Sequence, residues 1–431
     1  MSDYNAEDVR NIALVGPAGS GKTTLVEALL AATGVIPAPG SVARGTTVCD
    51  YDPMEKEYRH SLDIGITSFN AHGKHVNLLD TPGFPDFIGR SVSVLTAVET
   101  AAVVINAQAG IERMTQRMMT VAKDRQLCRL IIVNKIDAEG VDLEGLTAQI
   151  RDTFGPECLP INLPANGGKE VVDCFFQLSG SPTDFSNVAE AHGRIIDQVV
   201  EVDEALMEIY LEQGQELQPD QLHDPFEKAL REGHLIPVCY LSAETGAGIP
   251  ELLEILVRLM PNPSEGNPPA FMKGEGASLT PVVIKPDPNL HVLAHVFKII
   301  NDPFRGKLGI FRIHQGRITP NSQLLIGDAR KPIKVTHLYR LQGNEQVEVQ
   351  EGVPGDILAI ARVDDVHFDA VLHDSHDEDH HHLRSMECPV PLYGLAITPK
   401  KRGDEQKLTD ALHKLEAEDP CFHVEHNAST N

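Results

Sequence analysis

Short apolar runs alternate with amphipathic stretches over the first half of the chain. Ile12–Val15 is an unbroken apolar run, and Thr24–Leu30 after it is a helix-forming stretch. Unbroken apolar runs of this length predict buried strands. Further strands are predicted at His75–Leu79, Ala101–Ile105, Leu130–Val133 and Ile236–Leu241, and a helix over roughly 112–126. Strands alternating with helices favour a doubly wound, mostly parallel sheet, which binds ligands at the carboxyl ends of its strands.

The stretch between the first strand and the first helix is the first candidate binding site. It has the pattern Gly-x-x-x-x-Gly-Lys-Thr in the strand–loop–helix context of a phosphate-binding P-loop. Glycines let backbone N–H groups converge on phosphates, and the helix N-terminus adds partial positive charge. Lys22 is expected to act on the outer phosphates as a catalytic residue, and Thr23 to bind Mg²⁺. The predicted nucleotide-binding residues here are Gly16, Pro17, Ala18, Gly19, Ser20, Gly21, Lys22, Thr23 and Thr24.

A second motif, Asp80-Thr81-Pro82-Gly83, directly follows a predicted strand. An acidic residue at a strand end beside a P-loop is placed to hold the Mg²⁺ shell, so Asp80 joins Thr23 as a predicted metal residue. Gly83 leaves a backbone N–H free to meet a γ-phosphate and is predicted to be nucleotide-binding and catalytic.

The third motif, Asn134-Lys135-Ile136-Asp137, indicates which base is bound. A carboxylate at Asp137 can accept two hydrogen bonds from guanine, whereas adenine has no donor at its N1. Lys135 can lie along the ring face, and Asn134 can tie this loop to the P-loop. Ser242 and Ala243, after the last apolar run, are predicted to form a second loop beside the base. The motifs together predict GTP or GDP with Mg²⁺ as cofactors.

The second half of the chain changes character. From about residue 290, short β-rich runs separated by turn residues predict an all-β barrel. These runs are His291–Phe297, Gly309–Ile313, Gln323–Ile326, Lys334–Leu341 and Asp356–Ala361. Beyond the barrel, a helix is predicted over Asp404–Glu418, between strands at Pro391–Thr398 and Phe422–Val424.

The run from His373 to His382 is rich in histidine and carboxylates. Such a run could ligate Zn²⁺ or Ni²⁺, with His376 and His380 as the residues to test. A solvated linker between two domains fits the same composition, because the run is polar and lies between apolar segments.

Composition narrows the class of protein. The formal net charge of −25 argues against a protein that binds naked nucleic acid by broad phosphate neutralisation. Seven scattered cysteines indicate reduced thiols and no disulfide framework or zinc site. No secretory leader or membrane-spanning run is present in the sequence. A cytoplasmic protein with no membrane or DNA partner is therefore expected.

The motifs together resemble those of translational GTPases, and specifically of elongation factor G. The resemblance rests on the three motifs above, on Gly45–Asp50 and Asn106–Glu112, and in the second half on Asn301–Leu308 and Val353–Ile357. It implies an α/β P-loop GTPase domain, then an all-β barrel and a partial ferredoxin-like α+β domain. It further implies a monomeric GTPase that couples GTP binding and hydrolysis to a ribosomal step, either translocation or ribosome disassembly.

The resemblance also divides the chain. The GTP-binding domain is expected over 1–265, with an inserted subdomain over about 155–235 whose long helix is Val188–Glu212. The barrel is expected over 275–375, a His/acidic linker over 376–388, and a truncated ferredoxin-like domain over 389–431. The chain would then end inside a domain that buries its apolar face poorly.

The residues that depart from the family pattern are those expected to surround the γ-phosphate. Phe84 stands where family members that hydrolyse GTP usually carry a water-positioning histidine, and a phenyl ring cannot exchange protons. Pro17 and Gly19 also depart from the family P-loop. The switch residue that completes the Mg²⁺ shell is Asp63 by one alignment, and Thr67 or Gly65 by another. His60, His72 or His75 could substitute as the water-orienting group.

Two alternatives to a working GTPase follow. The first is a GTP-dependent binding switch with little or no hydrolysis, because of Phe84. The second is a P-loop ATPase or kinase outside translation, which the carboxylate of Asp137 disfavours.

Overall fold

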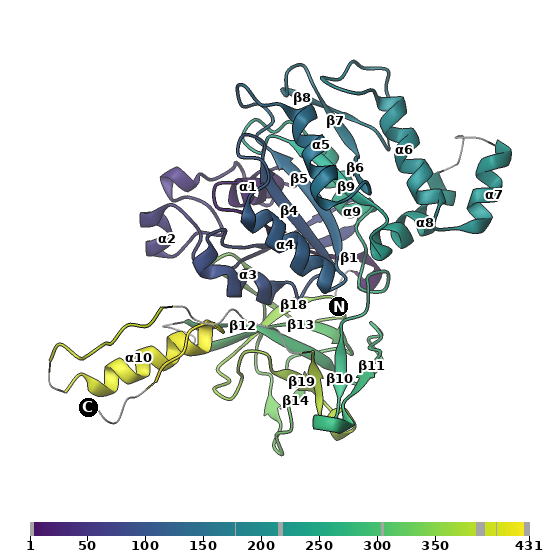
Figure 1. Ribbon diagram of the computed structural model, residues 1–431. Helices are drawn as coiled ribbons and strands as arrows, with labels where there is room; N and C mark the ends of the chain where they lie inside the picture. Colours follow the sequence, from purple (N-terminus) through teal and green to yellow (C-terminus); the bar gives the residue numbers. More distant parts are fainter. Residues whose placement is uncertain are drawn as a thin grey trace.

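The first unit is built on a seven-stranded sheet with the strand order β2-β3-β1-β4-β5-β9-β6 (Figure 1). The computed structural model describes residues 4–176, 178–213, 219–302, 306–384, 393–401 and 403–425. The strands are β1 (Val9–Val15), β2 (Gly65–Ala71), β3 (Lys74–Asp80), β4 (Thr100–Asn106), β5 (Cys128–Asn134), β6 (Cys158–Pro160) and β9 (Ile236–Leu241). All neighbours pair in parallel except β2, which runs antiparallel to β3. The predicted mostly parallel sheet is confirmed.

Helices cover both faces of this sheet, because successive residues of each buried strand point to opposite sides. In β1, Ile12 and Leu14 share a core with α1 (Lys22–Ala32) and α9 (Ile249–Arg258). Ala13 and Val15 belong to the core on the other face. That second core also takes residues from α3 (Ile88–Val94), α4 (Arg113–Asp124) and α5 (Leu143–Phe154). Short helical turns and α2 (Pro53–Tyr58) lie in the connection between α1 and β2.

The segment between β6 and β9 forms the inserted part of the first unit. It contains the hairpin β7 (Asn162–Ala165) and β8 (Glu170–Asp173), then α6 (Val188–Val200), α7 (Glu204–Gln213) and α8 (Pro219–Glu232). The prediction of one helix over Val188–Glu212 is wrong. Asp203 Oδ1 accepts a hydrogen bond from the Leu206 N–H at 2.9 Å, which is an N-cap contact that starts a second helix.

An eight-stranded antiparallel sheet forms the second unit, with the order β15-β14-β19-β12-β13-β18-β16-β17. Its strands are β12 (Leu293–Asp302), β13 (Gly306–Gln315), β14 (Gln323–Ile326), β15 (Ile333–Lys334), β16 (Leu338–Gln342), β17 (Glu345–Val349), β18 (Ile357–Ala361) and β19 (Val371–His373). A further bridge pairs Ile318, before β14, with Gly352, after β17. The run predicted as one strand over Lys334–Leu341 is divided between β15 and β16.

The described part of the predicted His/acidic linker over 376–388 contains a helical turn at His376–Glu378 and a short strand after it, while His376 and His380 remain exposed. A three-stranded sheet has the order β11-β10-β20, made of β10 (Phe271–Lys273), β11 (Thr280–Val282) and β20 (His381–Leu383). His381 is buried in β20, and His373 is buried at the end of β19. The ring nitrogens of His373 lie 2.8 Å from Ser375 O and 2.7 Å from Gly327 O. These backbone contacts explain why polar residues occupy buried positions.

His380 of this run lies with Glu275 and Asp328, and these three exposed side chains offer ligand atoms within 4.8 Å of one another. His376 Nδ1 lies 3.0 Å from an Asp379 oxygen, whereas His380 Nδ1 faces Asp328 at 3.2 Å. The two histidines that the sequence favoured as zinc ligands therefore contact different carboxylates. Residues 385–388 of the predicted linker lie outside the described residues.

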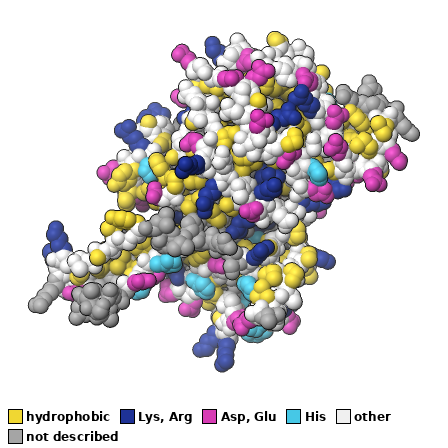
Figure 2. All heavy atoms as spheres, in the orientation of Figure 1, with side chains coloured by type: hydrophobic (Ala, Val, Ile, Leu, Met, Phe, Trp, Pro, Cys, Tyr) yellow, Lys and Arg dark blue, Asp and Glu magenta, His cyan; other side chains and the backbone are white. Residues whose placement is uncertain are grey.

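Of the three predicted elements of the third segment, the described residues form one. The helix α10 (Glu405–Glu418) is present and packs beside β12, where Glu418 Oε1 accepts the Asn301 N–H at 2.7 Å. Residues 393–398 and 422–424 form no strand, and Pro391 and Leu392 lie outside the described residues. A strand needs a hydrogen-bonded neighbour, and the described residues supply none here. Hydrophobic side chains therefore gather on the surface beside α10 (Figure 2), and Tyr393 and Leu395 are 82% and 73% exposed.

The two larger units share a buried interface. Phe297, Leu308 and Ile357 of the second unit belong to the same core as α3 of the first. Arg312 of β13 pairs with Glu99, which precedes β4, and both side chains are 5% exposed. In the described part of the chain, no helix has the length and apolarity that crossing a membrane requires.

Candidate nucleotide-binding site

The connection between β1 and α1 has the backbone that its glycines predict. Gly16 has φ +137°, and a Cβ there would lie 2.5 Å from the carbonyl oxygen of Val104 in β4. Gly21 has φ +90°, and a Cβ there would lie 2.4 Å from the side-chain nitrogen of Asn134. Both positions therefore require glycine on two grounds, the left-handed backbone and the close neighbours. The loop is thus held tightly against the carboxyl ends of β4 and β5.

Lys22 is the first residue of α1, and its ammonium folds back over the loop. Its Nζ donates to the carbonyl oxygens of Gly16 and Pro17, both at 2.9 Å. Burial lowers the pKa of Lys22 to about 8, against the opposing effect of the nearby Asp80 and Asp50 charges. Two backbone carbonyls thus hold a buried cation within the loop that the sequence predicts to receive phosphates.

Next to this lysine lies a group of buried oxygens. The Thr23 hydroxyl donates to Asp80 Oδ2 at 2.6 Å, while Asp80 Oδ1 is buried without a hydrogen bond. Asp50 is buried as well, and its carboxylate lies near the Ser61 hydroxyl without a hydrogen bond of good geometry. Burial and the Asp50 charge raise the pKa of Asp80 to about 7. Buried carboxylate and hydroxyl oxygens with spare acceptor capacity fit a hard divalent cation such as Mg²⁺.

Asp50 is a residue to which the sequence assigned no role. It lies in the connection between α1 and β2, where no hydrophobic period fixes the position of any side chain. The only signal was its place in the Gly45–Asp50 stretch that carried part of the family resemblance. Only the folded chain brings Asp50 next to Asp80.

The three alternatives for the switch residue, Asp63, Gly65 and Thr67, lie in or just before β2. Thr67 lies within β2, and its hydroxyl donates to Leu78 O at 3.1 Å. Gly65 begins β2 and packs against Cys49. Asp63 pairs with Lys298 and Arg90, at 3.0 and 3.2 Å. None of the three contacts Thr23 in this structure.

Ser61 contacts Thr23 instead, with 3.2 Å between the two hydroxyl oxygens. The charges of Lys298 and Arg90 outweigh the effect of burial and hold the pKa of Asp63 below its ordinary value. Arg90 also pairs with Asp419 at 3.4 Å. Through Asp63, the segment before β2 is therefore connected to the second unit and to the segment that follows α10.

The loops predicted to surround the base converge on the P-loop. Asn134 donates from its side-chain nitrogen to Ser20 O at 2.9 Å and accepts the Ala243 N–H at 3.0 Å. Lys135 Nζ donates to Gly19 O at 2.9 Å. Asp137 is exposed at the end of the same loop. The predicted tie between Asn134 and the P-loop is confirmed, and it joins segments that are far apart in the sequence.

Gly83 lies directly against the P-loop. The Ala18 N–H donates to Gly83 O at 3.1 Å, and a Cβ at Gly83 would lie 2.4 Å from the Ala18 nitrogen. No side chain other than hydrogen fits at this position. Phe84 follows, 37% exposed, with the ring of His60 against its own at a centroid distance of 4.5 Å.

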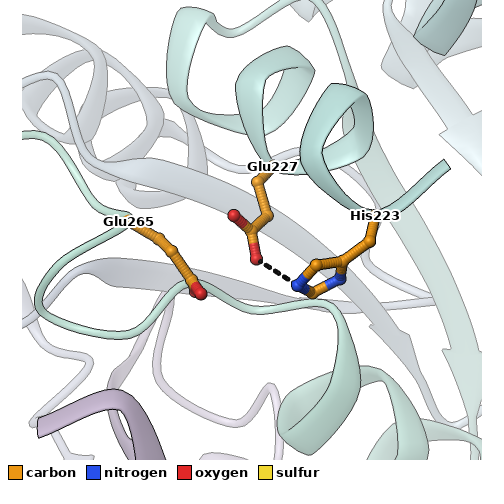
Figure 3. A group of neighbouring side chains, drawn as sticks. All are labelled: His223, Glu227 and Glu265. Atoms are coloured by element: carbon orange, nitrogen blue, oxygen red, sulfur yellow. Dashed lines mark ion pairs between the residues drawn. The ribbon is translucent and has the colours of Figure 1, made fainter. Parts of the chain in front are cut away.

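A second group of titratable side chains lies outside this site. His223 Nε2 on α8 lies 3.0 Å from Glu227 Oε1 on the same helix, and Glu265 approaches from the segment after α9 (Figure 3). The three offer ligand atoms within 4.8 Å of one another. Glu265 also accepts the Asn262 N–H at 3.0 Å. Each group thus has a protein partner, and we assign this cluster no metal.

This cluster predicts a pH-dependent stability. Burial and the neighbouring Glu265 raise the pKa of Glu227 from 4.5 to about 8. A carboxyl group with a raised folded-state pKa destabilises the fold as it ionises, so stability falls as the pH rises from about 4.5 to about 8. Glu227→Gln should remove this loss and stabilise the protein by about 1–2 kcal/mol at pH 8.5, with less effect near pH 5.

Denaturant unfolding at the two pH values measures this effect. Glu232→Gln, an exposed change on the same helix, is the matched control and should leave the pH dependence as it is. If Glu227→Gln changed the free energy of unfolding equally at both pH values, the raised pKa of Glu227 would be contradicted.

Family models match nearly the whole chain. Residues 7–262 match the Elongation factor Tu GTP binding domain. Residues 291–370 match Elongation factor G domain 2, and residues 388–431 match Elongation Factor G, domain III. The last match supports the partial ferredoxin-like domain, of which the described residues form the helix.

Similar proteins give the same family. The chain is 32% identical over 454 aligned positions to the elongation factor G-like proteins of two Mycobacterium tuberculosis strains, CDC 1551 and H37Rv. A crystal structure of a Thermus thermophilus protein superposes with a TM-score of 0.83 at 34% identity. These alignments cover 98% of this chain but only 62% and 63% of the relatives. The chain therefore spans about three fifths of the length of the relatives it matches. It belongs to the family of the elongation factor Tu GTP binding domain and is similar over almost its whole length to elongation factor G-like proteins.

Proposed function

We propose that this chain binds GTP and GDP with Mg²⁺ between the P-loop and the loops after β5 and β9. The observation that carries the proposal is the position of Asn134, which holds Ser20 of the P-loop and Ala243 of the last loop together. This arrangement leaves the exposed Asp137 carboxylate to accept the N1–H and amino group of guanine. Lys135 would lie along the ring face, and Ser242 would line the base beside Ala243.

The phosphates would occupy the P-loop, residues 16–24. The Lys22 ammonium, which now donates to the carbonyl oxygens of Gly16 and Pro17, would donate to the outer phosphates instead. The Ala18 N–H, which now donates to Gly83 O, would donate to a phosphate oxygen. Thr23 and Asp80 would hold Mg²⁺, which neutralises charge on the phosphates when bound. Buried Asp50 would face the same cation. The Gly83 backbone would then meet the γ-phosphate.

The proposed reaction is hydrolysis of GTP to GDP and phosphate, coupled to a ribosomal step in the cytoplasm. The step is translocation or ribosome disassembly. Switch segments that order around a γ-phosphate change their contacts with neighbouring domains. Here Asp63 pairs with Lys298 of β12, and Arg90 pairs with Asp419. A nucleotide that reorders the segment before β2 would break or remake these ion pairs. It would thereby change the contacts of the GTP-binding unit with the barrel and with the segment that follows α10.

The second candidate is a GTP-dependent switch with little hydrolysis, and Phe84 favours it. The phenyl ring lies directly after Gly83 and cannot position a water molecule by hydrogen bonding.

One assay decides between the candidates. GTP turnover is measured with and without ribosomes, for the unmodified chain and for Phe84→His. Ribosome-stimulated turnover in the unmodified chain supports a working GTPase, and Phe84→His should raise it at least about tenfold. Tight GTP binding by both proteins, with turnover only after Phe84→His, supports the silent switch. Absence of GTP binding in both proteins would contradict both candidates.

A further inference from the structure

His60 lies beside Phe84, the position at which family members that hydrolyse GTP usually carry a water-positioning histidine. Its ring is tilted by 54° against the ring of Phe84, with centroids 4.5 Å apart, and lies 6.4 Å from the ring of Phe87. The next residue, Ser61, touches Thr23. The imidazole therefore lies against Phe84 and is next in sequence to the residue that contacts Thr23.

The backbone fixes which ring nitrogen is available. His60 Nδ1 lies 3.2 Å from the carbonyl oxygen of Ser61. A carbonyl only accepts hydrogen bonds, so Nδ1 is the donor in this contact. In the neutral ring Nε2 then carries the lone pair and is a hydrogen-bond acceptor. An acceptor at this end of the ring is what an attacking water requires.

The other two histidines that the sequence offered for this role lie elsewhere. His72 Nε2 is 3.4 Å from Glu254 of α9. His75 is buried with its ring stacked on Tyr4 at 4.5 Å, and its Nδ1 lies 2.8 Å from Asn70. Neither contacts Phe84, Thr23 or Asp50.

We propose that His60 orients the attacking water in the GTP-bound state, with the face of Phe84 supporting its ring. This proposal rests on the proposed GTPase function and names the residue that acts there in place of a histidine at position 84. Water oxygen bonds to the γ-phosphorus, the bond from that phosphorus to the bridging oxygen breaks, and GDP leaves. The protons of the water pass to inorganic phosphate and solvent. His60 accepts a hydrogen bond from the water and keeps no proton.

The test compares His60→Ala, His60→Gln and the control His72→Ala in the full chain. A fluorescent GTP analogue measures binding in Mg²⁺, and single-turnover hydrolysis is followed with and without ribosomes. His60→Ala should bind GTP within about twofold of the unmodified chain and hydrolyse it at least about tenfold more slowly. His60→Gln should retain part of the rate through its amide oxygen, and His72→Ala should retain all of it.

A second comparison separates water positioning from a structural role. If His60 positions water, its loss should matter little once Phe84→His supplies another imidazole, so the double variant should match Phe84→His alone. If His60 only supports the loop, its loss should slow both backgrounds equally, and the proposal fails. It also fails if the unmodified chain binds GTP without any turnover, or if His60→Ala keeps the full rate. Failure of the unmodified chain to bind GTP would instead overturn the proposed function, so the binding measurement tells the two failures apart.

Discussion

Replacement of Asp137 by Asn should weaken GDP binding by at least about 100-fold, because the guanine N1–H and amino group then meet an amide in place of a carboxylate. The same variant should bind xanthosine diphosphate more tightly than the unmodified chain does, since xanthine presents an oxygen where guanine has its amino group. Asn134 and Lys135 fix the loop through Ser20 and Gly19, so the substitution should leave the loop in place.

Titration calorimetry with both nucleotides measures this exchange of specificity. Glu139→Gln is the matched control, because Glu139 is an exposed carboxylate two residues further along. Its GDP affinity should not change. An Asp137→Asn variant that binds GDP as tightly as the unmodified chain would show that this carboxylate does not read the base.

Substitution of Arg312 by Met should lower the free energy of unfolding by about 3–5 kcal/mol, because it leaves the Glu99 charge buried without its partner. Both side chains are 5% exposed, and the side-chain nitrogen of Asn11 also donates to the Glu99 carboxylate, at 3.1 Å. Adding Glu99→Gln to the Arg312→Met variant should restore at least half of the loss, since it removes the unpaired charge. The Arg312–Glu99 pair joins the barrel to the GTPase unit. The loss of unfolding free energy should therefore come from a weaker interface between these two units.

Denaturant unfolding, followed by circular dichroism, gives these values. Arg194→Met is the control, because Arg194 and its partner Glu190 are 49% and 46% exposed. An exposed pair contributes about 0–1 kcal/mol. If Arg312→Met and Arg194→Met cost the same, the buried pair does not hold the two units together.

The sequence predicted those parts of the site that depend on local patterns. β1, β4, β5 and β9 each contain an unbroken apolar run, and β3 contains one interrupted by Asn77. The ends of these strands and the loops after them carry the Gly, Asp and Asn residues that phosphate and guanine sites need. A parallel sheet brings the carboxyl ends of its strands to one edge. Asn134 therefore contacts Ser20 although more than a hundred residues separate them in the sequence. The strand pattern alone was enough to predict this contact.

Sequence reasoning failed where position depends on distant partners. β2 was missed because Gly65–Ala71 is rich in small and polar residues and is ordered by pairing with β3. Asp50 and Ser61 come from a connection without hydrophobic period, so their approach to Thr23 and Asp80 could not be predicted. The strand predicted over residues 391–398 has apolar residues at alternating positions, yet no neighbouring strand pairs with its described part. Of the buried histidines of the 373–382 run, His373 depends on the backbone carbonyls of Ser375 and Gly327, and His381 on that of Glu378.

Calorimetric titration of the full chain with GTP and with ATP, each with Mg²⁺, tests the central claim most directly. The site described here should hold GTP at least about 100-fold more tightly than ATP, because a carboxylate that accepts two hydrogen bonds from guanine finds no donor at N1 of adenine. Equal affinity for the two nucleotides, or no binding of either, would contradict it.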